Sequence, residues 1–165
     1  MNFIRHLIFS LAFILLMSLA SAKELKSDEL NYAISVPDGW TVTFQNAVGF
    51  SIASPDGKQT MTLLIRNAGS ATLDSTSIAE IEQGLLKAGS KKVSSKNFTI
   101  GGLPAYELVC SVGKTPFAST YVTHLTVANS KLYNLSAMHL GGNVLQDTEL
   151  CKGLASFHFL QSPKS

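Results

Sequence analysis

Apolar and polar residues alternate with a period of two through most of the chain after Leu30, a pattern typical of half-buried β-strands. It predicts strands over residues 32–36, 41–44, 50–53, 60–65, 92–100, 105–112, 117–127 and 132–138. Pro37-Asp38-Gly39 and Pro55-Asp56-Gly57 are typical turn sequences, and the second predicts a hairpin. Asn129-Ser130 predicts a tight turn between the last two strands. The three strands from 105 onward therefore form an antiparallel meander in this interpretation.

The period changes to that of a helix after Asn67. Ser77 and Glu80 have capping-box spacing, and Gly89 stands where a helix C-terminal cap belongs. One helical face would carry Ile78, Ile81 and Leu85. We therefore expect a helix over 77–88 with one buried stripe.

A second helix is predicted near the end of the chain. Asn143 and Gln146 have the spacing of a cap, and Leu150, Leu154 and Phe157 repeat at helical intervals after them. A sheet built of hairpins, with one helix between strand groups and one at the end, indicates the α+β class.

The first 22 residues have the pattern of a secretory signal peptide. Arg5 precedes an apolar run over 7–19, and Ala20-Ser21-Ala22 offers small residues for cleavage. Removing residues 1–22 from the 165 leaves residues 23–165, which suit a single domain. The run is short for a membrane span, so no transmembrane anchor is predicted. The new N-terminus would be Lys23 and not a cysteine, so we expect a periplasmic or secreted protein that is not a lipoprotein.

The charge balance excludes one class of function. After removal of the signal, 12 basic residues face 11 acidic ones. A net charge near +1 provides no field for nucleic-acid binding.

Cys110 and Cys151 are the only cysteines in the sequence. Export to an oxidising compartment makes a disulfide between them the first hypothesis, and two reduced, buried thiols are the alternative. A bridge would enclose about 40 residues and contribute about 4 kcal/mol in the loop-entropy description.

Catalytic and metal-binding patterns do not stand out. His124, His139 and His158 lie far apart and lack metal-ligand spacing, so no metal or cofactor is predicted. The chain has no Gly-x-Ser-x-Gly nucleophile elbow. We therefore interpret the protein as not being an enzyme.

Two segments have a functional interpretation beside a structural one. Lys87, Lys91, Lys92 and Lys96 lie close together with no acidic residue between them, a candidate patch for an acidic protein surface or, peripherally, an anionic lipid. The alternative is an edge strand that lysines protect from aggregation. His139-Leu-Gly-Gly-Asn143 precedes a helix and could hold an anion, or form a plain turn.

Four segments together resemble the PsbP-like superfamily: Tyr32-Ala-Ile-Ser-Val-Pro-Asp-Gly-Trp40, the hairpin at 55–57, the middle helix and Gly153-Leu-Ala-Ser-Phe-His-Phe159. That superfamily includes PsbP of the oxygen-evolving complex, the bacterial envelope DcrB proteins and Mog-type Ran-binding proteins. The resemblance implies an α/β/α sandwich, an antiparallel sheet with helices on both faces. It also implies an accessory or binding role without catalysis, and it assigns no ligand to a numbered residue.

The sequence-based prediction of function is an exported, non-catalytic accessory or protein-binding module of the envelope or secreted fraction, with a protein partner. By analogy with Mog-type proteins, that partner could belong to a host. One alternative is a carrier of a small ligand or lipid in an apolar cleft between sheet and helix. The other is a hydrolase in which a serine or cysteine hydrogen-bonds one of the histidines.

Overall fold

The computed structural model describes residues 23–70, 72–114 and 118–161. The predicted signal peptide lies outside these ranges. Among the described residues the strands are β1 (Lys23–Ser27), β2 (Tyr32–Val36), β3 (Thr41–Asn46), β4 (Gly49–Ala53), β5 (Gln59–Asn67), β6 (Lys91–Ile100), β7 (Leu103–Val112), β8 (Ser119–Ala128) and β9 (Lys131–His139). The helices are α2 (Ser75–Lys87), the 3₁₀ turn η1 (Val144–Gln146) and α3 (Thr148–Ser156).

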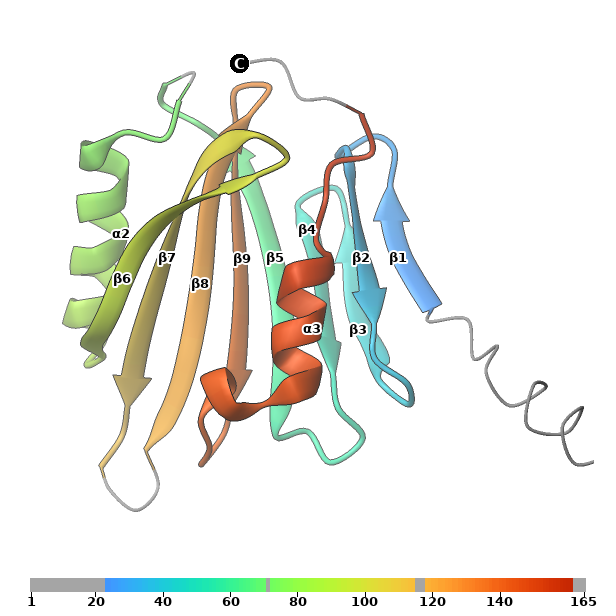
Figure 1. Cartoon of the computed structure of the whole chain (residues 1–165), viewed down its shortest axis with the longest axis vertical. Coiled ribbons are helices and arrows are strands. Elements are labelled where there is room, and N and C mark those ends of the chain that lie inside the picture. The colour runs from blue at the N-terminus through green and yellow to red at the C-terminus, as the bar shows by residue number, and fades with distance from the viewer. Residues whose placement is uncertain (1–22, 71, 115–117, 162–165) are drawn as a thin grey trace, which may run out of the picture.

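Seven strands form one antiparallel sheet in the order β3-β4-β5-β9-β8-β7-β6 (Figure 1). The hairpin prediction at 55–57 is confirmed, because β4 and β5 pair across it. The meander of β7, β8 and β9 is confirmed as well. β1 and β2 pair with each other in a separate hairpin, and an isolated bridge joins Ala33 of β2 to His158 after α3. β1 was not predicted from the sequence.

One face of the sheet, here called the inner face, carries the hydrophobic core. Strands β4, β5 and β9 direct Phe50, Leu63 and Leu135 into it, and each is almost fully buried. Figure 1 shows α3 in front of β5, with the β1–β2 hairpin beside it. Tyr32 of β2 and Leu150 of α3 complete this core. Each large side chain buried in this way contributes about 1.5–3 kcal/mol.

The opposite, outer face lacks a complete helical layer. Helix α2 lies beside the edge strand β6 and has no buried residue, so its predicted buried stripe is wrong. A polar contact joins α2 to the sheet instead: Glu82 accepts hydrogen bonds from Lys92 and from the hydroxyl of Tyr106. The predicted α/β/α sandwich is therefore wrong. The fold is β-rich, with one large antiparallel sheet, a short helix on the inner face and a peripheral helix at one edge.

The caps of both helices differ from the predicted ones. Asp74, and not Ser77, caps α2 by accepting from the backbone N–H of Ser77. Asn143 caps only the 3₁₀ turn η1, and Asp147 caps α3. Trp40, which follows the turn at 37–39, lies in the core with 8% of its surface exposed.

A pair of glycine substitutions tests the packing of the sheet. Gly49 has φ +136°, and a Cβ there would lie 1.9 Å from the carbonyl oxygen of Leu63. We expect Gly49→Ala to lower the free energy of unfolding by about 3 kcal/mol or more, because backbone atoms must move. Gly84→Ala, in α2 with open space around it, should raise that free energy by up to about 1 kcal/mol. Urea denaturation measures both changes, and an equal effect of the two variants would contradict the close approach of β4 to β5.

Candidate functional site

A groove of about 620 Å³ lies between α3 and the inner face of strands β6, β7 and β8. Most of its walls are apolar: β6 contributes Phe98 and Ile100, β8 contributes Val122, and α3 contributes Leu154 and Ala155. Helix α3 contacts β2, β5 and β9, so the inner face over β6–β8 stays partly open. Small-molecule sites in proteins have volumes of about 300–1,000 Å³, and this groove falls within that range.

The groove holds one row of ionisable side chains that the sheet register creates. Lys96 on β6 is directly opposite Glu107 on β7, and Glu107 is directly opposite His124 on β8. Side chains at directly opposite positions share a face. The Lys96 Nζ lies 3.1 Å from Glu107 Oε1, and the His124 Nε2 lies 3.0 Å from Glu107 Oε2. The exposed fractions of the Lys96, Glu107 and His124 side chains are 64%, 14% and 11%.

His124 is held in its neutral form. Burial lowers the pKa of His124, and this effect outweighs the Glu107 carboxylate, which favours the charged ring. Because an ionised carboxylate only accepts hydrogen bonds, the neutral ring carries its proton on Nε2 and donates it to Glu107. The Phe98 ring lies against the imidazole, with the ring centroids 4.8 Å apart. Glu107 therefore has one oxygen on Lys96 and the other on His124.

Cys151 lines the groove from α3, and its thiol is not activated. The Sγ atom donates to the carbonyl oxygen of Val144 at 3.3 Å. Burial raises the pKa of the Cys151 thiol, and the charges of Asp147 and Glu107 raise it further. A thiol with a raised pKa is a poor nucleophile. Within residues 23–70, 72–114 and 118–161, no serine or cysteine side chain hydrogen-bonds a histidine ring.

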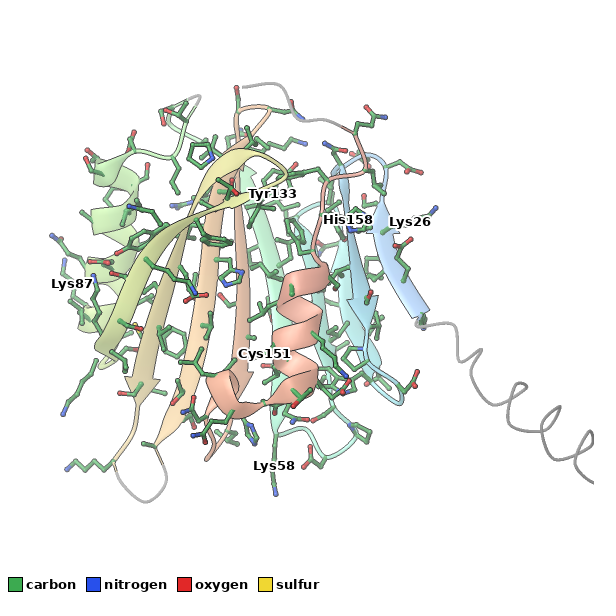
Figure 2. The ribbon with its side chains drawn as sticks, in the orientation of Figure 1. Lys26, Lys58, Lys87, Tyr133, Cys151 and His158 are labelled. Atoms are coloured by element: carbon green, nitrogen blue, oxygen red, sulfur yellow. The ribbon has the colours of Figure 1, made fainter. Side chains whose placement is uncertain are left out.

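The predicted disulfide between Cys110 and Cys151 is not formed, and both cysteines are free. Cys110 is directly opposite Tyr121, whose hydroxyl donates to Ser90 beside α2, so Cys110 lies on the outer face. Cys151 lies on α3 and faces the groove on the inner face (Figure 2). The sheet itself therefore separates the two sulfur atoms.

The four lysines of the candidate patch do not form one surface. Lys92 is directed to the outer face, where its Nζ lies 2.6 Å from Glu82 Oε1. Lys96 is directed to the inner face and pairs with Glu107. Lys87 ends α2 at the periphery of the molecule, and Lys91 begins β6 (Figure 2). The strand that carries three of these lysines is an edge strand, which agrees with the protective interpretation.

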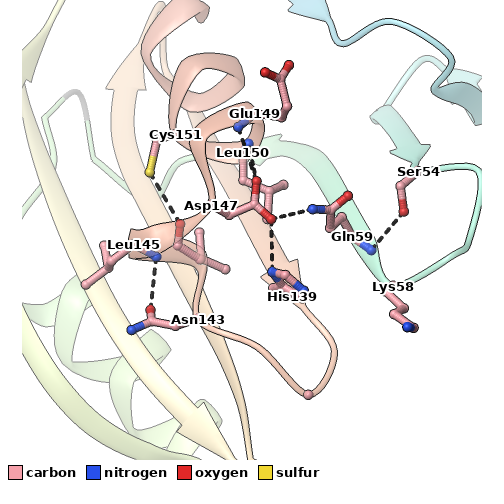
Figure 3. A network of polar contacts seen from close by, with 12 residues as sticks. Ser54, Lys58, Gln59, His139, Asn143, Leu145, Asp147, Glu149, Leu150 and Cys151 are labelled. Atoms are coloured by element: carbon pink, nitrogen blue, oxygen red, sulfur yellow. Dashed lines mark hydrogen bonds and ion pairs between the residues drawn. The ribbon is translucent and has the colours of Figure 1, made fainter.

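A second polar network fixes α3 to the sheet (Figure 3). Asp147 Oδ1 accepts from the backbone N–H groups of Glu149 and Leu150, at 3.2 and 3.1 Å. Asp147 Oδ2 accepts from the Gln59 side-chain amide and lies 2.9 Å from His139 Nδ1. Gln59 and His139 are directly opposite each other on β5 and β9. One buried carboxylate thus caps the helix and connects it to the two central strands.

In the turn from His139 to Asn143, the backbone N–H groups of both glycines already donate hydrogen bonds within the protein. The Gly141 N–H donates to Ser119 Oγ, and the Gly142 N–H donates to the His139 carbonyl. This arrangement favours a plain turn over an anion site.

His158 is exposed, and its Nδ1 contacts the Ser156 carbonyl. In the part of the chain that the structure describes, there is no group of three His, Cys, Asp or Glu residues suited to a metal ion.

Sequence reasoning did not predict that Lys96, Glu107 and His124 lie side by side in the groove. It named Lys96 and His124 for other reasons and did not single out Glu107. It also missed Asp147, although an Asp immediately before Thr148-Glu149-Leu150 is a helix N-cap signal.

No family model matches this sequence, and no curated protein matches it. Solved structures show the fold. A protein from Bacteroides thetaiotaomicron is 14% identical, with a TM-score of 0.56; the match covers 85% of this chain and 49% of that one, so this chain spans about half its length. LpqN, involved in cell envelope biogenesis of Mycobacterium tuberculosis, is 18% identical, with a TM-score of 0.52 and a coverage of 84% of this chain and 81% of that one. None of the helices within the described ranges is long and apolar enough to cross a membrane.

Replacing Asp147 tests the connection between α3 and the sheet. We expect Asp147→Ala to lower the free energy of unfolding by about 2 kcal/mol, because the helix cap and two buried contacts disappear together. Asp147→Asn should lose less, since asparagine also caps helices. Denaturant unfolding measures both, with Asp38→Ala in an exposed turn as the control. Equal stability of Asp147→Ala and the control would show that α3 is held in another way.

The lowered pKa of His124 predicts a pH dependence of stability. The unfolded histidine has its usual pKa of about 6.5, so below that pH the unfolded chain binds a proton that the folded chain resists. The contribution of neutral His124 is fully present above about pH 6.5 and is lost as the pH falls toward the lowered pKa of the folded state.

We expect the unfolding midpoint in urea to fall between about pH 7.5 and about pH 5.5, and to fall less in His124→Gln. A variant at the exposed His158, His158→Gln, should keep the wild-type change. Identical changes in the wild type and in His124→Gln would contradict this assignment.

Proposed function

We propose that this protein is an exported binding protein of the cell envelope that holds an elongated, mainly apolar ligand in the groove between α3 and β6–β8. The observation that carries this proposal is the groove itself, with its volume of about 620 Å³ and its apolar walls. Of the functions considered from the sequence, the carrier of a small ligand or lipid requires such a space between sheet and helix.

We propose binding without catalysis because the ionisable side chains of the β6–β8 row in the groove contact one another. Glu107 has each oxygen on a neighbouring side chain, and His124 is neutral. Cys151 is held as a thiol by burial and by nearby negative charge. A hydrolytic site would require a base that activates a nucleophile, and these groups do not have that arrangement.

Two observations support a location in the envelope. Residues 1–22 have the pattern of an export signal. The fold is also that of LpqN, a protein involved in cell envelope biogenesis. Together they favour the accessory role predicted from the sequence, and the PsbP-like resemblance implies the same kind of role.

A protein partner is the second candidate, and one surface favours it. Phe44 on β3, Val48 in the β3–β4 turn and Leu64 on β5 are exposed by 37%, 50% and 49%. The register brings Leu64 opposite Gly49, next to Val48, and Phe44 opposite Ser51 on the same hairpin. A cluster of exposed apolar side chains of this kind is typical of contact surfaces.

Filling the groove tests the first proposal. Ala155 is exposed and lines the groove, so Ala155→Trp would place an indole in it. We expect N-phenyl-1-naphthylamine, a neutral apolar fluorophore, to bind the wild type with enhanced fluorescence. The affinity should fall by about tenfold or more in Ala155→Trp, since the indole takes the ligand's space.

Ala79→Trp is the matched control, because Ala79 is also an exposed helical alanine but lies on α2, away from the groove. It should bind the fluorophore as the wild type does. Absence of binding to the wild type, or an equal loss in both variants, would contradict the groove as the ligand site. Circular dichroism of each variant verifies that the fold is retained.

A further inference from the structure

We infer that the ligand is a single-chain amphiphile with an anionic head group, which binds at Lys96 while its chain lies along the apolar walls of the groove. The inference rests on the proposed function and adds the chemical class of the ligand. The groove contains two different surfaces, an apolar wall from α3 and β8 and a charged row on β6–β8.

Lys96 presents the accessible charge of this row. Its side chain is 64% exposed, whereas the Glu107 side chain is 14% exposed. An ammonium group has three donors, and the contact with Glu107 Oε1 takes one of them. The other donors remain at the rim of the groove, within reach of an incoming anion.

A cationic head group would find a poorer site. Glu107 is the acidic residue of the groove lining, and both of its oxygens are already engaged, one by Lys96 and one by His124. A new cation would have to reach a carboxylate that is mostly buried and already lies between two side chains. An incoming anion displaces neither partner.

The strand that carries Lys96 is itself basic. β6 contains Lys91, Lys92 and Lys96 and no acidic residue. Lys92 is directed to the outer face and is paired with Glu82, which leaves Lys96 as the β6 lysine that lines the groove. A head group at Lys96 would have its chain beside Phe98 and Ile100, which follow on the same strand.

The test compares head groups on a constant chain. N-phenyl-1-naphthylamine bound to the wild-type protein is displaced with dodecanoate, dodecanol or dodecyltrimethylammonium. We expect dodecanoate to displace it at about tenfold lower concentration than either of the others. That ratio equals about 1.4 kcal/mol and is the size of a charge-assisted hydrogen bond.

Lys96→Met should abolish this preference while the fluorophore still binds, and Lys96→Arg should retain it, because arginine keeps the charge. Lys87→Met is the control, since Lys87 is an exposed lysine at the end of α2, outside the groove lining. It should behave as the wild type does. Lys96 is itself largely exposed, so its replacement leaves the core intact.

The remaining outcomes separate the two proposals. If the wild type does not bind the fluorophore, the proposed function fails, and this inference fails with it. If the fluorophore binds but all three amphiphiles displace it equally, or the cationic one does so best, the anionic head group is wrong and the groove stands. A preference for dodecanoate that persists in Lys96→Met overturns the assignment of Lys96.

Discussion

The arrangement of the inner face depends on the carboxylate of Asp147. It caps α3 and, at the same time, contacts Gln59 and His139 on the two central strands. The helix is short, and short helices are stable mainly through capping and tertiary contacts. Gly153 brings the same helix close to the sheet, because a Cβ there would lie 2.5 Å from the end of the Met61 side chain. These contacts place α3 over β5 and β9, and they leave the inner face over β6–β8 open.

The groove follows from this placement and from the sheet register. The helix and the β1–β2 hairpin cover the inner face over β4, β5 and β9, so the inward side chains of these strands form the core. The strands on the other side of α3 carry apolar side chains that face a partly open space, together with one row of ionisable groups. A few polar groups within an apolar groove are the usual composition of a small-molecule site. The same row satisfies its own charges when no ligand is bound, which avoids an isolated buried charge.

Most of the strands could be predicted from the sequence because apolar and polar residues alternate along them, although β3 and β6 have no fully buried residue. The exception is β1, which has a single buried residue, Leu25, and therefore no readable alternation. The helical period predicted that α2 forms, but it did not predict how α2 packs. Ile81 and Leu85 are only half-buried beside β6, so the helix does not cover the sheet. For that reason the predicted helical layers on both faces were wrong. The prediction of a disulfide was wrong for a similar reason, because the spacing of two cysteines along the sequence does not reveal that a sheet lies between them. The row at Glu107 depends on pairing between three strands, and local sequence patterns do not contain that information.

The most direct test of this account is to locate a bound ligand on the sheet. A dodecyl amphiphile that carries a nitroxide at its chain end can be titrated into isotope-labelled protein while backbone amide signals are followed by NMR. The account predicts that paramagnetic broadening is strongest at Val122 and Leu154 in the groove and weakest at Phe44 and Val48, at the β3–β4 end of the sheet. Broadening centred on the β3–β4 end, or no saturable broadening at either place, would contradict it.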